Sequence, residues 1–229
     1  MPFVVKNHTL CAGTITARLN RILLPETAMD VHNVTADAET FTANVYLATG
    51  DAPTLVDAGA MDGVVDVIRE YTDELDSVVL THQHGDHVAQ LDAVLDAFDA
   101  ELYANADHPR RTNGLDDGDT IQMGDETFEV VYTPGHADDH VSLVGETTLF
   151  SGDTVVHDDG AFEGGSFGRT DNPGQSRERL IESIQHLLDR MPETVEHMYS
   201  GHGGVFHGDV REIVETALER AEKREPKYD

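Results

Sequence analysis

The sequence predicts an α/β fold, and two observations lead to this prediction. Short apolar runs, such as Ser77–Leu80 and Phe128–Tyr132, are typical of buried strands, and a polar loop follows each of them. Other segments, such as 175–190, repeat apolar residues at the spacing of an amphipathic helix. A chain of 229 residues is long enough for an ample core, so we expect residues 1–229 to form a single domain.

The first half of the chain alternates apolar runs with helical patterns. Apolar runs bounded by turn residues predict edge strands within 1–24 and further strands over 41–48, 54–56, 77–80 and 101–104. Apolar residues that cover one helical face predict helices over 60–71 and 86–98. The segments 25–40 and 105–119 are rich in turn residues and indicate loops.

The second half repeats this alternation. Strands are expected over 128–132 and 141–150 and in a short run from Val195, and helices over 175–190 and from a cap at Gly208-Asp209. We expect the tail, 221–229, to fray. A long Gly-rich loop, 154–173, is expected to form a wall of a substrate pocket, because long loops in compact domains are often functional.

The most specific signal is the segment 81–87, Thr-His-Gln-His-Gly-Asp-His. Four potential metal ligands, namely His82, His84, Asp86 and His87, lie between a predicted strand and a predicted helix. In an extended loop His82 and His84 point the same way, because side chains alternate with a period of two. Asp86 and His87 lie at the helix start and are displaced enough to face a second metal ion. Imidazole and carboxylate ligands suit zinc, iron or manganese.

Three further segments place a His or an Asp directly after an apolar run. They are Thr133-Pro134-Gly135-His136, Phe150-Ser151-Gly152-Asp153 and Tyr199-Ser200-Gly201-His202-Gly203-Gly204. In each segment Gly or Pro shapes a tight loop beside the polar side chain. These loops therefore strengthen the prediction of a metal site.

The order of these motifs, HxHxDH, then GH, GD and GHG, resembles that of the metallo-β-lactamase-fold hydrolases. The resemblance runs from about Asn44 to the C-terminal helix and includes Leu55–Gly59. The chain is most similar to the short glyoxalase II-like branch, which has a segment like Gly168–Gly174 after the GD motif. The resemblance implies a four-layer αββα sandwich, whereas the pattern of elements alone indicates only α/β.

The resemblance also implies a centre of two divalent metal ions, most often zinc, with iron or manganese as alternatives. The implied ligands are His82, His84 and His136 for the first ion, Asp86, His87 and His202 for the second, and Asp153 as a bridge between them. Ions roughly 3.5–4 Å apart generate a hydroxide from water at neutral pH, which would attack a carbonyl carbon. Asp86 and Asp153 would be the catalytic carboxylates, and Asp86 would also orient the nucleophile.

Two residues are expected to support this centre without binding metal. The resemblance implies that Asp57 is a buried carboxylate that orients ligands, and a turn or helix-capping role is the alternative. His140 lies where family members often carry a second His after the GH motif. We expect His140 to support the ligands from behind.

Two residues of the long loop are candidates for contact with substrate. Arg169 is the best-placed cation for a substrate carboxylate, and an ion pair with Asp171 is an equally good interpretation. His157 is within reach of the site, although the adjacent Asp158 and Asp159 suit a solvated turn equally well.

The ligand set favours a thioester as substrate. No obvious general acid accompanies it, and a thiolate leaves readily because a thiol pKa of about 8.5 is close to neutral pH. We therefore expect a small hydroxyacyl-thiol as substrate, cleaved by a glyoxalase II-like metallohydrolase. Asp153 argues against a true β-lactamase, in which the family places Cys or Ser. The chain ends soon after the GHG motif and its helix, so a thiol other than glutathione is also expected.

Other activities of the same fold remain open at this point. A persulfide dioxygenase would use one iron ion at the first group of ligands. A phosphodiesterase or ribonuclease is disfavoured by the acidic composition, and a lactonase is a further alternative. A module without catalysis would take up metal and turn over neither thioesters nor phosphodiesters.

The composition restricts the partners that we expect. The chain has 44 acidic and 15 basic residues and a net charge of −29, which repels nucleic acids and anionic membranes. This balance resembles that of halophile proteins, in which salt screens self-repulsion; an ordinary acidic protein is the alternative. Cys11 is alone, so no intrachain disulfide is expected. We expect a cytoplasmic protein, because no signal peptide or run of roughly 18 apolar residues is present.

Overall fold

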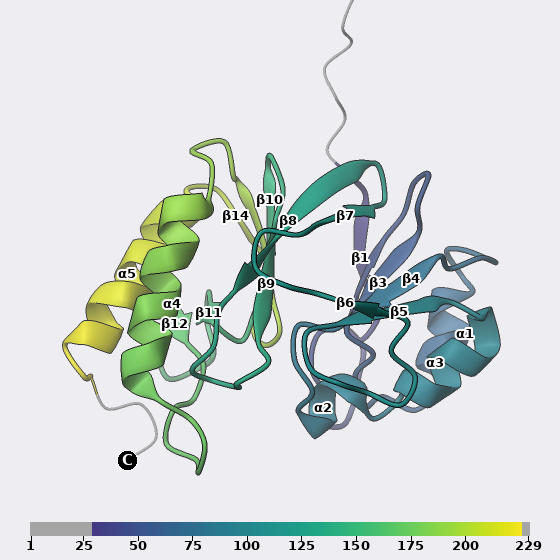
Figure 1. The fold of residues 1–229 in the computed structure, drawn as a ribbon, viewed down its shortest axis with the longest axis horizontal. Coiled ribbons are helices and arrows are strands. Elements are labelled where there is room, and N and C mark those ends of the chain that lie inside the picture. The colour runs from purple at the N-terminus through teal and green to yellow at the C-terminus, as the bar shows by residue number, and fades with distance from the viewer. Residues whose placement is uncertain (1–28, 226–229) are drawn as a thin grey trace, which may run out of the picture.

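The computed structural model describes residues 29–225, which form two facing six-stranded sheets with helices on both outer sides (Figure 1). Cys11, the strands expected within 1–24 and the end of the predicted tail, 226–229, lie outside the described residues. Among residues 29–225, none of the helices combines the length and the apolar character that crossing a membrane requires.

The first sheet holds the segment that precedes the HxHxDH motif. Its strands are, in spatial order, β1 (Val31–Asn33), β2 (Tyr46–Ala48), β3 (Thr54–Val56), β4 (Ser77–Val79), β5 (Glu101–Ala104) and β6 (Asn113–Gly114). The pairs from β1 to β3 are antiparallel, and those from β3 to β6 are parallel. Parallel partners need crossover connections. The connection from β3 to β4 contains α1 (Val64–Ile68), and that from β4 to β5 contains α2 (Gly85–Val88) and α3 (Leu91–Phe98).

The second sheet holds the strands that precede the other three motifs. Its spatial order is β14 (Phe206–His207), β13 (His197–Ser200), β10 (Thr148–Gly152), β9 (Val141–Val144), β8 (Glu126–Tyr132) and β7 (Thr120–Met123). The helices α4 (Arg177–Arg190) and α5 (Val210–Glu222) cover its outer face (Figure 1). A separate two-stranded ribbon consists of β11 (Val155–Val156) and β12 (Ser166–Phe167).

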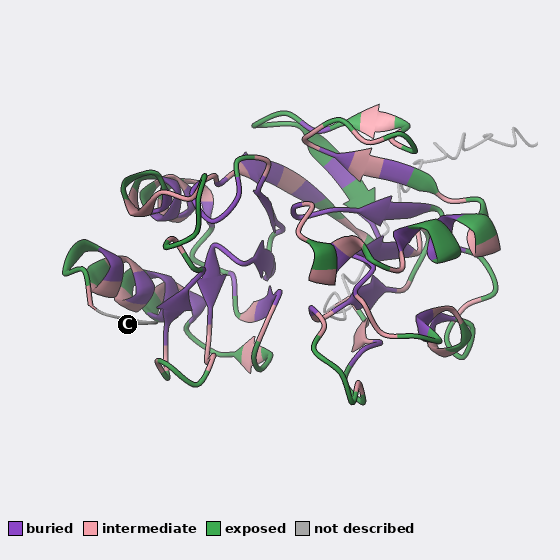
Figure 2. Ribbon diagram, turned by 90° about the horizontal axis from the view of Figure 1, so that it is seen from below, coloured by how far each residue is buried: buried purple, intermediate pink, exposed green. Residues whose placement is uncertain are grey.

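Three apolar cores hold the four layers together. One joins the first sheet to its helices and includes Leu55 and Leu95. The second fills the space between the sheets, where the rings of Tyr46 and Phe150 meet. The third joins the second sheet to α4 and α5 and includes Ile184. Figure 2 shows buried residues along the strands and exposed residues on the outer sides of the helices. The predicted four-layer αββα sandwich is confirmed.

Several predicted boundaries in the first half are wrong. The expected strand 41–48 is a strand only over 46–48, because residues 43 and 44 bond to the metal-site loops instead. The expected loop 25–40 contains β1. The expected helix 60–71 is helical only over 64–68, since its N-cap, Gly63, has a left-handed backbone. The expected helix 86–98 is broken into α2 and α3 at Gln90, whose N–H donates to Gly59.

The second half departs from the prediction in a similar way. The run 141–150 is two antiparallel strands, because the chain turns back between Val144 and Thr148. The expected loops 105–119 and 154–173 contain β6 and the β11–β12 ribbon, and β7 was not predicted. The cap at Asp209 is confirmed, as its side chain accepts from Glu212 N. The tail was expected to fray from Ala221, but α5 continues to Glu222.

Phe150→Ala tests the core between the sheets. The ring of Phe150 is fully buried and lies 5.2–5.9 Å, centroid to centroid, from three aromatic rings. We expect its removal to lower the free energy of unfolding by about 3–5 kcal/mol, because a cavity remains. Phe41→Ala is the control, since Phe41 is 79% exposed; it should change stability by less than about 0.5 kcal/mol. Chemical denaturation measures both, and equal losses would contradict the assignment.

Candidate metal centre

The structure brings all seven predicted ligands together at one end of the sandwich. The ligand loops follow β4 in the first sheet and β8, β10 and β13 in the second. Pairing makes β8, β10 and β13 run in one direction, so their carboxyl ends share an edge. The loops meet across the gap between the sheets. In each of three overlapping groups, the possible ligand atoms lie within 4.8 Å of one another.

The first group consists of three imidazoles, those of His82, His84 and His136. His84 Nδ1 lies 3.0 Å from His82 Nε2 and 2.9 Å from His136 Nε2. Zn–N bonds of about 2.0–2.1 Å in a tetrahedral site place nitrogen ligands about 3.3 Å apart, which is close to these separations. Burial lowers the pKa of both His82 and His136, so both favour the neutral form that binds metal.

The second group consists of Asp86, His87 and His202. His202 Nε2 lies 3.1 Å from Asp86 Oδ2, and His87 Nε2 lies 4.0 Å from the same oxygen. The hydrogen bond from His202 lowers the pKa of Asp86. Burial lowers the pKa of His202, but the hydrogen bond to Asp86 and the charges of Asp153 and Asp86 together raise it above its ordinary value. Both shifts favour the charged forms of Asp86 and His202.

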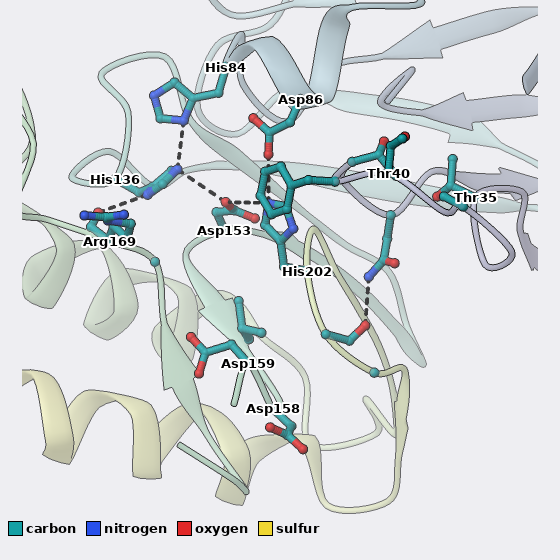
Figure 3. A pocket seen from close by; sticks show the side chains of 18 of the residues that line it. Thr35, Thr40, His84, Asp86, His136, Asp153, Asp158, Asp159, Arg169 and His202 are labelled. Atoms are coloured by element: carbon teal, nitrogen blue, oxygen red, sulfur yellow. Dashed lines mark hydrogen bonds and ion pairs between the residues drawn. The ribbon is translucent and has the colours of Figure 1, made fainter. Parts of the chain in front are cut away.

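Asp153 lies between the two groups (Figure 3). Its Oδ2 is 3.3 Å from His136 Nε2 and 3.5 Å from His202 Nε2, and its Oδ1 is 3.7 Å from His87 Nε2. Burial raises the pKa of Asp153, but His87 together with His202 and His82 holds that pKa well below its ordinary value. Within the described part of the chain, Asp153 Oδ1 and His87 Nε2 are buried and have no hydrogen-bond partner. A bound cation would satisfy both atoms, so the residues fit a metal centre.

Asp57 fixes the orientation of His87. The buried carboxylate accepts hydrogen bonds from the backbone N and the hydroxyl of Thr81, at 2.8 and 2.7 Å. Its Oδ2 lies 2.8 Å from His87 Nδ1, which directs the opposite nitrogen of the ring toward the centre. Burial disfavours the charged imidazole, but Asp57 and Asp153 raise the pKa of His87 well above its usual range. This geometry matches the expected orienting role.

His140 lies behind Asp153, with its ring fully buried. Its Nε2 accepts from the backbone N–H of Asp153 at 2.9 Å. Burial lowers the pKa of His140 to about 3, so the ring is neutral and its Nδ1 is free to donate to Thr133 Oγ1, 2.8 Å away. His140 thus positions Asp153 through its backbone and is not part of the ligand groups.

The carbonyl of Arg169 fixes His136. It lies 3.0 Å from His136 Nδ1 and accepts from it, which leaves His136 Nε2 to face the centre. The neighbouring Gly168 allows this approach, because a Cβ there would collide with Asp153 O and the His136 ring. Sequence analysis missed this contact, since a backbone carbonyl leaves no signal in residue type.

The guanidinium of Arg169 pairs with Asp171. Its Nε and Nη2 lie 2.9 and 2.7 Å from the two carboxylate oxygens, so the contact is bidentate. This is the alternative that the sequence left open. Arg169 nevertheless lines the cavity above the centre, and about half of its side chain is exposed, at 45%.

Comparison with known proteins fits this geometry. Residues 38–226 match the family described as the Metallo-beta-lactamase superfamily. The chain belongs to this superfamily. Hydroxyacylglutathione hydrolase of Hydrogenovibrio crunogenus is 32% identical over 149 residues, which are 64% of this chain and 53% of that protein. The chain therefore spans about half the length of the curated relatives that it matches.

Two solved structures of the superfamily's fold are also similar. A metallo-beta-lactamase superfamily protein from Sulfolobus tokodaii has a TM-score of 0.62 at 21% identity, over 85% of this chain and 86% of that chain. The protein TTHA1623, solved in a di-iron-bound form, has a TM-score of 0.57 at 27% identity, over 72% of this chain and 89% of that chain.

The segment 35–44 packs against two of the ligand loops. Sequence analysis did not single out this segment. Ala43 N donates to Asp86 O at 3.1 Å, and Asn44 N donates to Gly201 O at 2.7 Å. Phe41 stacks on the His202 ring, with centroids 5.3 Å apart and planes at 13°. The sequence predicts only a loop and a strand here, so the packing of this segment against the ligand loops is evident only from these long-range contacts.

The centre opens into a cavity of 920 Å³. Its walls come from 35–44, from the Gly-rich loop with Asp158, Asp159 and Arg169, and from the Gly203-Gly204 turn. Figure 3 shows His84, Asp86, His136, Asp153 and His202 together at its base. The expected pocket wall from 154–173 is thus present. His157 lies outside the lining and stacks on Phe206 at 4.6 Å.

His84→Ala tests the first ligand group. The substitution removes the nitrogen that lies closest to both partners, so we expect it to remove most of the tightly bound metal. Protein loaded with zinc and dialysed against metal-free buffer is analysed by elemental analysis. The control is His186→Ala, because His186 pairs with Asp117 on the surface, 3.1 Å away. Full metal content in the His84 variant would show that His84 is no ligand.

Proposed function

We propose that this protein is a metal-dependent hydrolase that cleaves a thioester of a small hydroxy acid, as glyoxalase II-type enzymes do. The observation that carries the proposal is the pair of ligand groups joined by Asp153 at the base of an open cavity. The similarity to relatives named hydroxyacylglutathione hydrolase supports the substrate class. The similarity to TTHA1623 in its di-iron-bound form supports two metal ions.

The donor set decides which ions are expected. His82, His84 and His136 would hold one ion, with Asp86, His87 and His202 around the other and Asp153 between them. Zinc is the ion we expect first, and iron and manganese also suit nitrogen and oxygen ligands. When bound, such ions polarise a carbonyl oxygen and lower the pKa of water toward neutrality.

Two carboxylates of the chain have defined tasks in this proposal. Asp86 lines the cavity, and its lowered pKa keeps it ionised, so it can accept a hydrogen bond from the attacking water. The surrounding histidines, His87 first, lower the pKa of Asp153 and favour its ionised form, and His140 holds its backbone in place. The imidazole of His202 is fixed by Asp86 on one side and Phe41 on the other.

The lining of the cavity favours a leaving group that departs without a proton. Among the described residues that line it, none is Lys, Tyr or Cys. A thiolate needs no general acid, because its pKa of about 8.5 makes it a good leaving group. An amine does need one. This supports thioester over amide hydrolysis.

The charge around the cavity indicates which thiol the thioester substrate contains. Arg169 is the one Lys or Arg side chain among its described lining residues, and it already pairs with Asp171. Asp158 and Asp159 lie in the wall of the Gly-rich loop. A thiol with fewer negative charges than glutathione therefore fits better. The net charge of −29 likewise supports a small-molecule substrate over a nucleic acid.

The second ligand group is the reason to prefer this proposal over a one-iron persulfide dioxygenase. Such an enzyme needs only the first group, whereas Asp86, His87 and His202 form a complete second group here. The observation therefore favours hydrolysis at two ions.

Release of free thiol from S-D-lactoyl thioesters tests the function. We expect zinc-loaded protein to hydrolyse them, chelation to abolish the reaction, and added zinc to restore it. A panel of thiols of different charge identifies the leaving group. The same protein is assayed with a phosphodiester, a lactone and a persulfide. Oxygen uptake with persulfide at one iron per chain, or turnover of phosphodiester alone, would overturn the proposal.

Arg169→Ala tests whether the guanidinium binds substrate. The substitution keeps the backbone carbonyl that holds His136. We expect KM to rise several-fold while kcat stays within about twofold, because a substrate anchor contributes uniform binding. Asp171→Asn is the matched control, since it releases the guanidinium without removing its charge. An unchanged KM in the Arg169 variant would assign Arg169 to the ion pair alone.

A further inference from the structure

The strands β13 and β14 form a hairpin whose two ends have different chemistry. Its tip, 201–205, carries His202 of the metal centre and Gly203 and Gly204 of the cavity wall. Its base holds His197 and His207, which are direct partners in the antiparallel register. β14 is the last strand of the second sheet, so this base lies at a sheet edge.

The two base imidazoles are in close contact. Gly208 N donates to Glu196 O at 2.8 Å, so positions 197 and 207 form the neighbouring pair without backbone hydrogen bonds, in which side chains lie closer. The rings are 4.8 Å apart at 76°. The Nδ1 atoms of His197 and His207 are 2.7 Å apart.

Two neutral imidazoles cannot both direct a lone pair into such a short gap. Either one nitrogen carries a proton and donates it to the other, or a cation lies between them. Glu196 Oε1 lies 3.6 Å from His197 Nε2. A carboxylate therefore lies near the nitrogen of His197 that faces away from His207. Metal–nitrogen bonds of about 2.0–2.1 Å require a separation of about 2.9–3.4 Å between neighbouring ligands.

We propose that His197 and His207 form a second, separate site for a divalent transition-metal ion such as zinc, with water as the remaining ligands. Opening the pair by a few tenths of an ångström reaches the required separation. An ion can enter, since His207 is exposed and 22% of the His197 side chain is accessible. The net charge of −29 raises the local concentration of cations.

The proposed site would act as a clamp on the catalytic hairpin. It shares no residue with the ligand groups of the centre. An ion bound across the base ties β14 to β13 and restricts the tip that holds His202. Two protein ligands predict weaker binding than at the centre, and copper is expected to bind more tightly than zinc, in the usual order for nitrogen ligands.

Zinc titrated into protein whose centre is already loaded with zinc tests the site. Calorimetry should detect one further ion per chain, and His197→Asn and His207→Asn should each weaken its binding at least tenfold. His186→Asn, a surface histidine outside the hairpin, is the control and should bind as the unchanged protein does. Either the absence of a further ion, or binding in both hairpin variants as tight as in the unchanged protein, would overturn the proposal and leave a hydrogen-bonded pair.

Amide exchange tests the clamp in the same samples. Added zinc should slow exchange at 201–206 in the unchanged protein and leave it unaltered in His207→Asn. A further ion that leaves exchange unaltered would overturn the clamp. These measurements use no substrate, so they test the site independently of the proposed thioester hydrolysis.

Discussion

The contact on which this structure depends is that between Asp153 and the histidines of both ligand groups. The carboxylate is buried, and its neighbours His87 and His202 are held by Asp57 and Asp86. Burial raises the pKa of Asp153, and the positive charge of the surrounding histidines, His87 first, holds it well below its ordinary value. Protons can supply part of that charge, but they leave His87 Nε2 and Asp153 Oδ1 without partners. A metal ion satisfies the carboxylate and the imidazoles at once, which is why this end of the sandwich suits a metal centre.

The sandwich places these groups through the direction of its strands. β3 and β4 are parallel, as are β10 and β13, so the polar loops after them gather at one end while the apolar cores fill the middle. Glycines then permit the close approach. At Gly201 a Cβ would collide with the carboxylate of Asp153, and at Gly168 it would collide with its backbone. Glycine is therefore needed at these two positions because the loops lie in close contact there.

The meeting of these seven side chains could be predicted from sequence because each lies in a short motif directly after an apolar run, and the fold followed from the order of these motifs. The contacts of Asn44 and the carbonyl of Arg169 could not, since they join residues far apart in the chain through backbone atoms. Sequence analysis did not predict the helix break at Gln90 or the turn between Val144 and Thr148, because the apolar spacing continues across both. The His197–His207 contact depends on strand register, which a two-residue strand does not specify.

The possible metal ligands and the residues of the cavity wall come from different parts of the fold. This explains why the fold and the metal centre do not determine the substrate. Every ligand lies in a tight loop fixed by the sheets, whereas the walls come from long segments that tolerate change. Phe41 illustrates this, since it is 79% exposed yet stacks on His202. A change at Asp158 would alter what enters the cavity without touching the possible metal ligands. Reaction type therefore follows from the buried charges around Asp153, and substrate choice from the exposed segments that enclose them.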